Sequence, residues 1–222
     1  MVVHDRLDRL LIWCGVVGPV LFVASFLING ALHPGYHPLR HPVSSLSLAP
    51  DAGWVQSVTF LVTGALLVAC AVGMGRAGWG RWTPILLGLV GAGLIGAGIF
   101  ACDPVKGYPV GTPVPASRTL HGIVHDQMST PVFTALPAAC LVLGRRFGRL
   151  GERRWRTYSI TTAVVFWLCF VLAALGFNGI DGFVPTGGLW QRLCLVVGLA
   201  WVVAVSLWLL QGGAPRAGAP KG

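Results

Sequence analysis

The sequence has little charge, and acidic charge is the scarcest. Only 10% of its 222 residues are charged, and 7 Asp and Glu stand against 16 Lys and Arg. Soluble domains carry about 25% charged residues, so a soluble globular protein is excluded. A mean hydropathy of +0.73 indicates a membrane protein instead. The net charge of +9 reflects the shortage of acids rather than a broad basic face, which argues against nucleic-acid binding.

Two further absences narrow the possible functions. The sequence contains no Walker loop and no Rossmann fingerprint, so nucleotide use is not indicated. It also contains no C-x-x-C pair, and all six cysteines fall inside apolar runs or at their edges. Cysteines in such places behave as small packing residues, and we expect no disulfide framework.

Six apolar runs are long enough to cross a bilayer, which takes about 20 residues in a helix. The runs are too long and too uniformly apolar for the strands of a membrane β-barrel, which alternate over about 10 residues. The sequence therefore predicts an all-α fold, a polytopic bundle of six transmembrane helices. The runs are Leu10–Leu32, Gly53–Gly75, Thr83–Cys102, Thr119–Gly144, Tyr158–Asn178 and Leu189–Gln211.

The chain is expected to form one membrane domain over residues 10–211, with short tails at 1–9 and 212–222. Twelve of the 16 basic residues fall in the tails and in the two loops that share a side with them, and four fall on the other side. Positive loops stay in the cytoplasm, so both termini are predicted there. Fourteen arginines against two lysines favour a bacterial protein, and we expect a multi-pass protein of the plasma membrane.

Polar side chains gather at the helix ends opposite the two termini. Such groups are costly at membrane depth and usually face a bundle interior, so their convergence predicts an outward-facing polar pocket. Asn29, Tyr36, Asn178 and Asp181 are the candidate ligand-contacting residues. The other polar side chains of this group are His33, Ser44, Ser45, Gln56, Ser57, Asp103, His121, His125, Asp126, Gln191 and Arg192.

The pattern His121-Gly-Ile-Val-His125 is the sharpest chemical element. Residues four apart share one helical face, and two histidines so placed can hold one metal ion or pass a proton. Asp103, where the third run ends, is a geometrically plausible third ligand, and zinc is the divalent ion considered. The pattern lacks the catalytic Glu of stronger zinc signatures, so two water-satisfied interfacial histidines remain the alternative.

Proline-rich loops connect the helices on the same side. The first contains His33-Pro34, His37-Pro38 and His41-Pro42, in which the prolines favour an extended backbone rather than a helix. Histidines spaced in this way do not share a face, so we interpret the loop as a stiff lid over the helix ends. In the third run Gly88, Ala92 and Gly96 are spaced for close helix packing.

These segments together resemble the bacterial family catalogued as domain of unknown function 998, over helices one to four at least. The resemblance implies a six-helix integral membrane protein and brings no established reaction. Its members often carry an acidic residue where Ser45 stands, which weakens any role carried over to that position. The segments are Gly18–Phe22, Pro34–Pro38, Val43–Leu46, Phe100–Pro104 and the His121 segment, and the matching positions are Pro34, Gly35, Tyr36, Ser44, Asp103 and His121.

Three classes of function stay open. The first is binding or transport of a lipid, a small ligand or a proton in the outward pocket. The second is a membrane-embedded metal-dependent lipid hydrolase or transferase, in which Ser44, Asp103 and Asp126 are the candidate catalytic groups. A looser similarity to membrane hydrolases of the ceramidase and adiponectin-receptor type supports it by residue type alone. The third is an accessory subunit of a membrane complex, and the oligomeric state is not predicted.

Overall fold

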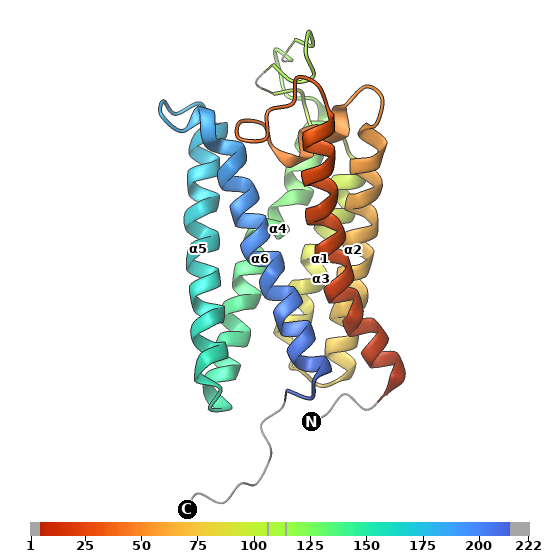
Figure 1. Ribbon diagram of the computed structural model, residues 1–222, viewed down its shortest axis with the longest axis vertical. Coiled ribbons are helices and arrows are strands. Elements are labelled where there is room, and N and C mark those ends of the chain that lie inside the picture. Colours follow the sequence, from red (N-terminus) through yellow and green to blue (C-terminus); the bar gives the residue numbers. More distant parts are fainter. Residues whose placement is uncertain (1–4, 106, 114, 214–222) are drawn as a thin grey trace, which may run out of the picture.

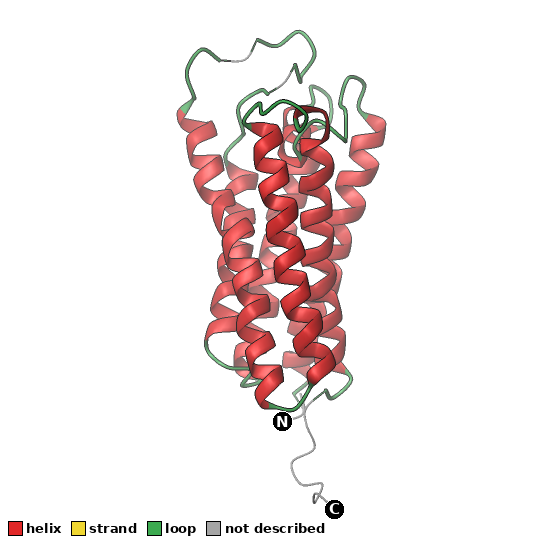
Figure 2. Ribbon diagram, turned by 90° about the vertical axis from the view of Figure 1, so that its left-hand side faces the viewer, coloured by secondary structure: helices red, strands yellow, loops and turns green. Residues whose placement is uncertain are grey.

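The computed structural model describes residues 5–105, 107–113 and 115–213. Six long helices carry the fold (Figures 1 and 2), and two short 3₁₀ helices lie in the loops. Lys106, Arg216 and Lys221, counted above for topology, lie outside the described residues, as does most of the expected C-terminal tail. The elements are α1 (Arg6–Leu32), η1 (Val43–Leu48), α2 (Gly53–Arg76), α3 (Trp82–Ile99), α4 (Leu120–Arg149), α5 (Arg153–Phe177), η2 (Val184–Thr186) and α6 (Gly187–Leu210).

The prediction of an all-α, six-helix membrane protein is confirmed. All six helices are long and apolar enough to span a membrane. The described part of the chain contains no strand, only an isolated bridge between Val105 and Tyr108. The six cysteines are all free thiols.

Some helices extend past the apolar runs, and at the start of α1 polar groups explain the extension. Helix α1 begins at Arg6 rather than Leu10, because the Asp5 carboxylate caps it by accepting a hydrogen bond from the Leu7 amide at 3.0 Å. Asp8 in the first turn then pairs with Arg76 of α2 at 2.6 Å. These contacts lie beyond the apolar core, where hydropathy carries no signal.

The third helix is shorter than its apolar run. Helix α3 ends at Ile99 rather than Cys102, and Phe100 already has an extended backbone. Pro104 follows closely, and proline disfavours helical geometry in the residue before it. The segment from Phe100 to Asp103 is therefore free to turn across the bundle end, where it contributes to the site described below.

The helices form a closed ring in which each packs against its neighbour in the sequence and α6 returns to α1. The start of α1 and the end of α6 lie at the same end of this bundle, which we call the terminal end (Figure 1). The three long connections, residues 33–52, 100–119 and 178–186, lie at the opposite end, which we call the loop end (Figure 2).

Glycines determine where neighbouring helices touch. Helix α4 lies close to α5 near the terminal end, where a Cβ on Gly144 would stand 3.2 Å from the Ser159 Cβ. Toward the loop end α4 lies against α3 instead, since a Cβ on Gly93 would stand 2.6 Å from the Met128 carbonyl. Helix α5 stays with α6, where Gly176 meets Gly187. Helices α4 and α5 therefore diverge toward the loop end, as Figure 1 shows.

Helices α2 and α3 cross in backbone contact at a glycine pair. A Cβ on Gly91 would stand 2.6 Å from the Gly64 carbonyl oxygen, and one on Gly64 would stand 2.5 Å from the Gly91 carbonyl oxygen. Backbone at this distance cannot move aside as a side chain can. Of the expected Gly88, Ala92, Gly96 stripe, only Gly96 makes a close approach, to the Met128 side chain of α4, whereas Ala92 is exposed.

We predict that Gly91→Ala destabilises the bundle by about 1–3 kcal/mol, the usual cost of overpacking. Gly88→Ala is the matched control on the same helix, because its Cβ would stand 3.8 Å from the Ala71 Cβ, an ordinary contact. Thermal unfolding of both variants in detergent measures the difference. Equal melting temperatures would show that the crossing is not as tight as the backbone distances indicate.

Candidate functional site

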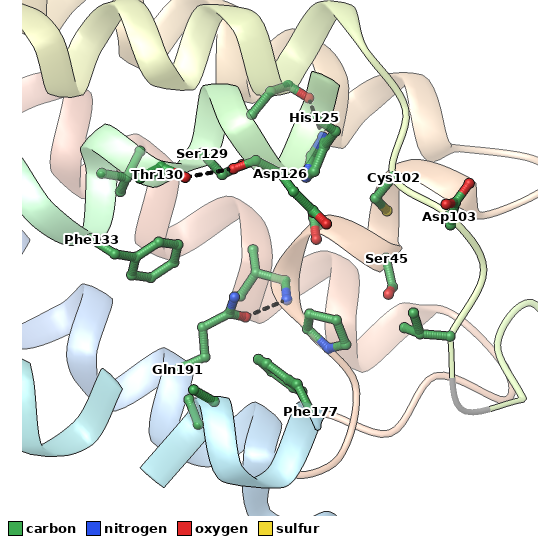
Figure 3. Close-up of a pocket in the computed structure, with 18 of the residues that line it drawn as sticks. Ser45, Cys102, Asp103, His125, Asp126, Ser129, Thr130, Phe133, Phe177 and Gln191 are labelled. Carbon is green, nitrogen blue, oxygen red and sulfur yellow. Dashed lines mark hydrogen bonds between the residues drawn. The ribbon is translucent and has the colours of Figure 1, made fainter. Parts of the chain in front are cut away.

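A cavity of about 540 Å³ lies inside the ring at the loop end (Figure 3). All six helices, η1 and the segment after α3 contribute to its wall, and α4 and α5 contribute most where they diverge. This volume is in the range of small-ligand pockets, about 300–1,000 Å³. Its apolar wall includes the rings of Phe22, Phe60, Phe133, Phe170 and Phe177, and its polar groups include Ser44, Ser45, Asp103, Arg118, His125, Asp126, Ser129, Thr130, Asn178 and Gln191.

The structure brings together only some of the residues that the sequence pointed to. Ser44, Asp103, His125, Asp126 and Asn178 line the cavity.

Asn29, Tyr36, His121 and Asp181 lie elsewhere. Asn29 is buried between α1 and α2, where its amide donates to the Ser25 hydroxyl at 3.2 Å. Asp181 is exposed in the turn after α5, and His121 is exposed beside the Phe100 ring. Tyr36 is buried in the roof of loops described below.

His125 is buried, with 3% of its surface exposed, and its ring is anchored by the end of α3. Its Nδ1 lies 2.8 Å from the Phe100 carbonyl oxygen and 3.1 Å from the Ala97 carbonyl oxygen. Carbonyls only accept hydrogen bonds, so Nδ1 carries a proton. In the neutral ring the other nitrogen, Nε2, is then an acceptor, and Figure 3 shows the ring turned with that edge toward the cavity.

Asp103 is engaged by the start of α4. Its two carboxylate oxygens accept hydrogen bonds from the Thr119 hydroxyl at 2.5 Å and the Thr119 amide at 3.1 Å. Thr119 is itself the N-cap of α4, and a carboxylate beside a helix N-terminus is stabilised by the helix dipole. A side chain on Gly122, in the first turn, would collide with this carboxylate.

His121, His125 and Asp103 do not form a metal-ligand group in this structure. Among residues 5–105, 107–113 and 115–213, no three His, Cys, Asp or Glu side chains lie close enough to share an ion. The two histidines share a helix face by spacing, but His125 turns inward to the α3 carbonyls while His121 stays at the surface.

Asp126 forms an ion pair with Arg118 at the rim of the cavity. Both side chains are more than half exposed, at 59% and 60%, so the pair contributes little to stability. Below it, the Thr130 hydroxyl donates to the Asp126 carbonyl at 3.0 Å and the Thr134 hydroxyl to the Thr130 carbonyl at 2.9 Å. A polar stripe thus descends along α4 from the rim.

This stripe reaches deep into the expected membrane span. Thr134 lies about 20 Å along the helix axis from Leu120, and it is both exposed and part of the cavity wall. At the same depth the rings of Phe133 on α4 and Phe170 on α5 stack with centroids 4.9 Å apart and are only partly buried. The cavity wall therefore continues along the seam between α4 and α5 to the depth where lipid chains would lie.

A residue without a role in the sequence-based hypotheses holds the roof of the cavity. Arg192 of α6 is 7% exposed, and its Nη1 donates to the carbonyls of His41 and Gly188, both at 3.0 Å, and of Pro38. Its Nη2 donates to the Tyr36 hydroxyl. The sequence placed Arg192 among interfacial groups, and no motif marks the carbonyls that it binds.

Tyr36 links Arg192 to the proline-rich loop by hydrogen bonds. Its hydroxyl accepts from Arg192 and donates to the Pro42 carbonyl at 2.9 Å. Burial raises the pKa of Tyr36 to about 12, although the Arg192 charge and hydrogen bond oppose the shift. The phenol is thus uncharged at neutral pH. Its ring packs against Tyr108, with centroids 5.2 Å apart, so residues 33–42 and the loop after α3 form one roof.

These features define a class, a polytopic membrane protein with a roofed cavity between its helices at the loop end. Residues 16–208 match the family model of proteins of unknown function DUF998, and the chain belongs to that family. The family suggested by the sequence is confirmed. No curated protein and no solved structure matches the chain.

We predict that Arg192→Gln lowers the free energy of unfolding by roughly 3 kcal/mol, because several buried acceptors lose their donor. Arg40→Gln, in the loop whose carbonyls Arg192 binds, is the control. Arg40 is exposed, so its replacement is expected to change stability by less than about 0.5 kcal/mol. Detergent unfolding curves compare the two. A similar small effect for both variants would contradict the role of Arg192 as the clamp of the roof.

Proposed function

We propose that this protein binds an amphipathic molecule of the membrane in the cavity between α4 and α5. The observation that carries the proposal is that one cavity joins a polar chamber at the loop end to an apolar slot, lined by Phe133, Phe170 and Phe177, at the depth of lipid chains. An amphiphile is the class of ligand that needs both. Its polar head fits the chamber near Ser45 and His125, and its chain fits the slot against these aromatic rings.

The terminal end of the bundle supports binding rather than passage through the protein. There Gly144 brings α4 against α5, and aromatic rings fill the space between the helices. Phe147 and Trp208 meet edge to face with centroids 5.1 Å apart, and Trp79 lies 5.3 Å from Trp208. These contacts pack the bundle at the terminal end, so a ligand would enter and leave from the loop end or the lipid side.

The orientation expected from the sequence places this chamber outside the cytoplasm, in the plasma membrane. The charge pattern supports it, because the arginine-rich connection between α4 and α5 lies at the terminal end. Positively charged loops are retained in the cytoplasm.

Alkaline phosphatase fusions test the orientation, since this reporter is active only after export. A fusion after Gly111, in the loop preceding α4, is expected to be active, and one after Gly151, in the turn preceding α5, inactive. Both glycines lie in connections between helices, so each fusion ends outside a span. The reverse pattern would place the chamber in the cytoplasm.

Filling the slot tests the binding itself. Ala174 of α5 lines the cavity, and Ala174→Phe is expected to exclude the ligand by volume. Ala65→Phe adds the same ring to an exposed position of α2, outside the cavity, and is the matched control. Organic extraction of detergent-purified protein, followed by mass spectrometry, measures the small molecules bound per chain.

We expect one molecular species near stoichiometric amounts in the wild type and in Ala65→Phe, and at least fivefold less in Ala174→Phe. Gel filtration confirms that each variant is monodisperse. Identical extracts from all three proteins would show that the cavity does not retain an amphiphile.

A further inference from the structure

The charged side chains around the cavity already have partners within the protein. Asp126 is paired with Arg118 at the rim. Asp103 accepts hydrogen bonds from the hydroxyl and amide of Thr119, at the positive end of the α4 dipole. Both carboxylates are therefore engaged before any ligand arrives.

No cation is left for a phosphate either. Arg118 is the one Lys or Arg among the described residues that line the cavity, and it is already paired. Arg192 is nearby in the sequence to the cavity residue Gln191, but its bonds go to the roof carbonyls and Tyr36. Burial raises the pKa of the Cys102 thiol to about 11, against the opposing hydrogen bonds of Ser44 and Ser47, so this thiol also stays neutral.

Two groups in the chamber, the Ser45 hydroxyl and the His125 ring, have hydrogen-bonding capacity that the protein does not use. The Ser45 hydroxyl is wholly buried and has no hydrogen-bond partner. A buried polar atom without a partner costs about 1–3 kcal/mol, so such a group points to a missing one. In the neutral His125 ring, Nε2 is an acceptor because Nδ1 donates to the α3 carbonyls. Figure 3 shows both residues facing the same chamber.

A hydroxyl on the ligand satisfies both groups, because it can accept a hydrogen bond from the Ser45 hydroxyl and donate one to Nε2 of His125. We propose that the ligand is an uncharged amphiphile whose head carries a hydroxyl, held between Ser45 and His125. This inference rests on the proposed function and adds the class of the head group. Because Arg118, Asp126 and Asp103 are already engaged, a charged head would have to displace one of their partners or be desolvated without one, at an energetic cost.

Three photoactivatable probes with the same diazirine-bearing acyl chain test the head-group class. They are a monoacylglycerol, its phosphate ester, and an analogue with a quaternary ammonium head. Wild-type protein in phosphatidylcholine vesicles is illuminated with each, and crosslinks are mapped to peptides of α4 and α5. We expect the monoacylglycerol to label these peptides at least fivefold more than either charged probe, and Ala174→Phe to abolish this labelling.

Ser45→Ala is expected to reduce labelling by the monoacylglycerol about fivefold, the effect of one hydrogen bond. Ser57→Ala, on α2 outside the cavity wall, is the matched control and is expected to label as the wild type does. Unchanged labelling in Ser45→Ala would overturn the role of its hydroxyl. The comparison of probe charge uses wild-type protein, so it does not depend on how well this variant folds.

The outcomes separate this inference from the proposed function. Labelling by a charged probe that equals or exceeds the neutral one, and is lost in Ala174→Phe, would overturn the neutral head group while the amphiphile site stands. If no probe gives labelling that is lost in Ala174→Phe, both the neutral head group and the amphiphile site are overturned.

Discussion

The divergence of α4 from α5 is the constraint on which the site depends. In a bilayer the hydrophobic effect does not hold helices together, so packing is governed by how closely two backbones can approach. Gly144 brings α4 to α5 near the terminal end, and Gly93 brings it to α3 near the loop end. A straight helix cannot follow both neighbours, so a wedge opens between α4 and α5. The cavity occupies that wedge.

The wedge between α4 and α5 becomes an enclosed chamber only where loops cover its end. Arg192 holds those loops in place. A guanidinium has five donors and no acceptor, so it can collect several carbonyls at once. The proline-rich loop is suited to this, because its backbone has few amides and forms no regular structure that would use its carbonyls. Arg192 thus supplies hydrogen-bond donors in place of the backbone amides that the prolines lack. The Arg192 guanidinium can be buried without a carboxylate partner because the roof carbonyls and the Tyr36 hydroxyl solvate its charge.

Much of the fold could be predicted because a membrane helix is specified by local composition. The six runs matched six helices, and errors at their ends arose where capping or proline, rather than hydropathy, decides. The site was predicted less well. Ser44, Asp103, His125, Asp126 and Asn178 do line the cavity, since polar groups at that depth face inward.

The sequence could not show which groups the candidate site residues would hydrogen-bond. The spacing of His121 and His125 fixes a common helix face, but not that the end of α3 would offer carbonyls to only one of them. The same limit applies to Asp103, which looked like a free ligand and instead caps the start of α4 with Thr119. Long-range hydrogen bonds therefore engage two of the candidate metal ligands within the wall, and the Ser45 hydroxyl and Nε2 of His125 are the groups that remain open to a ligand.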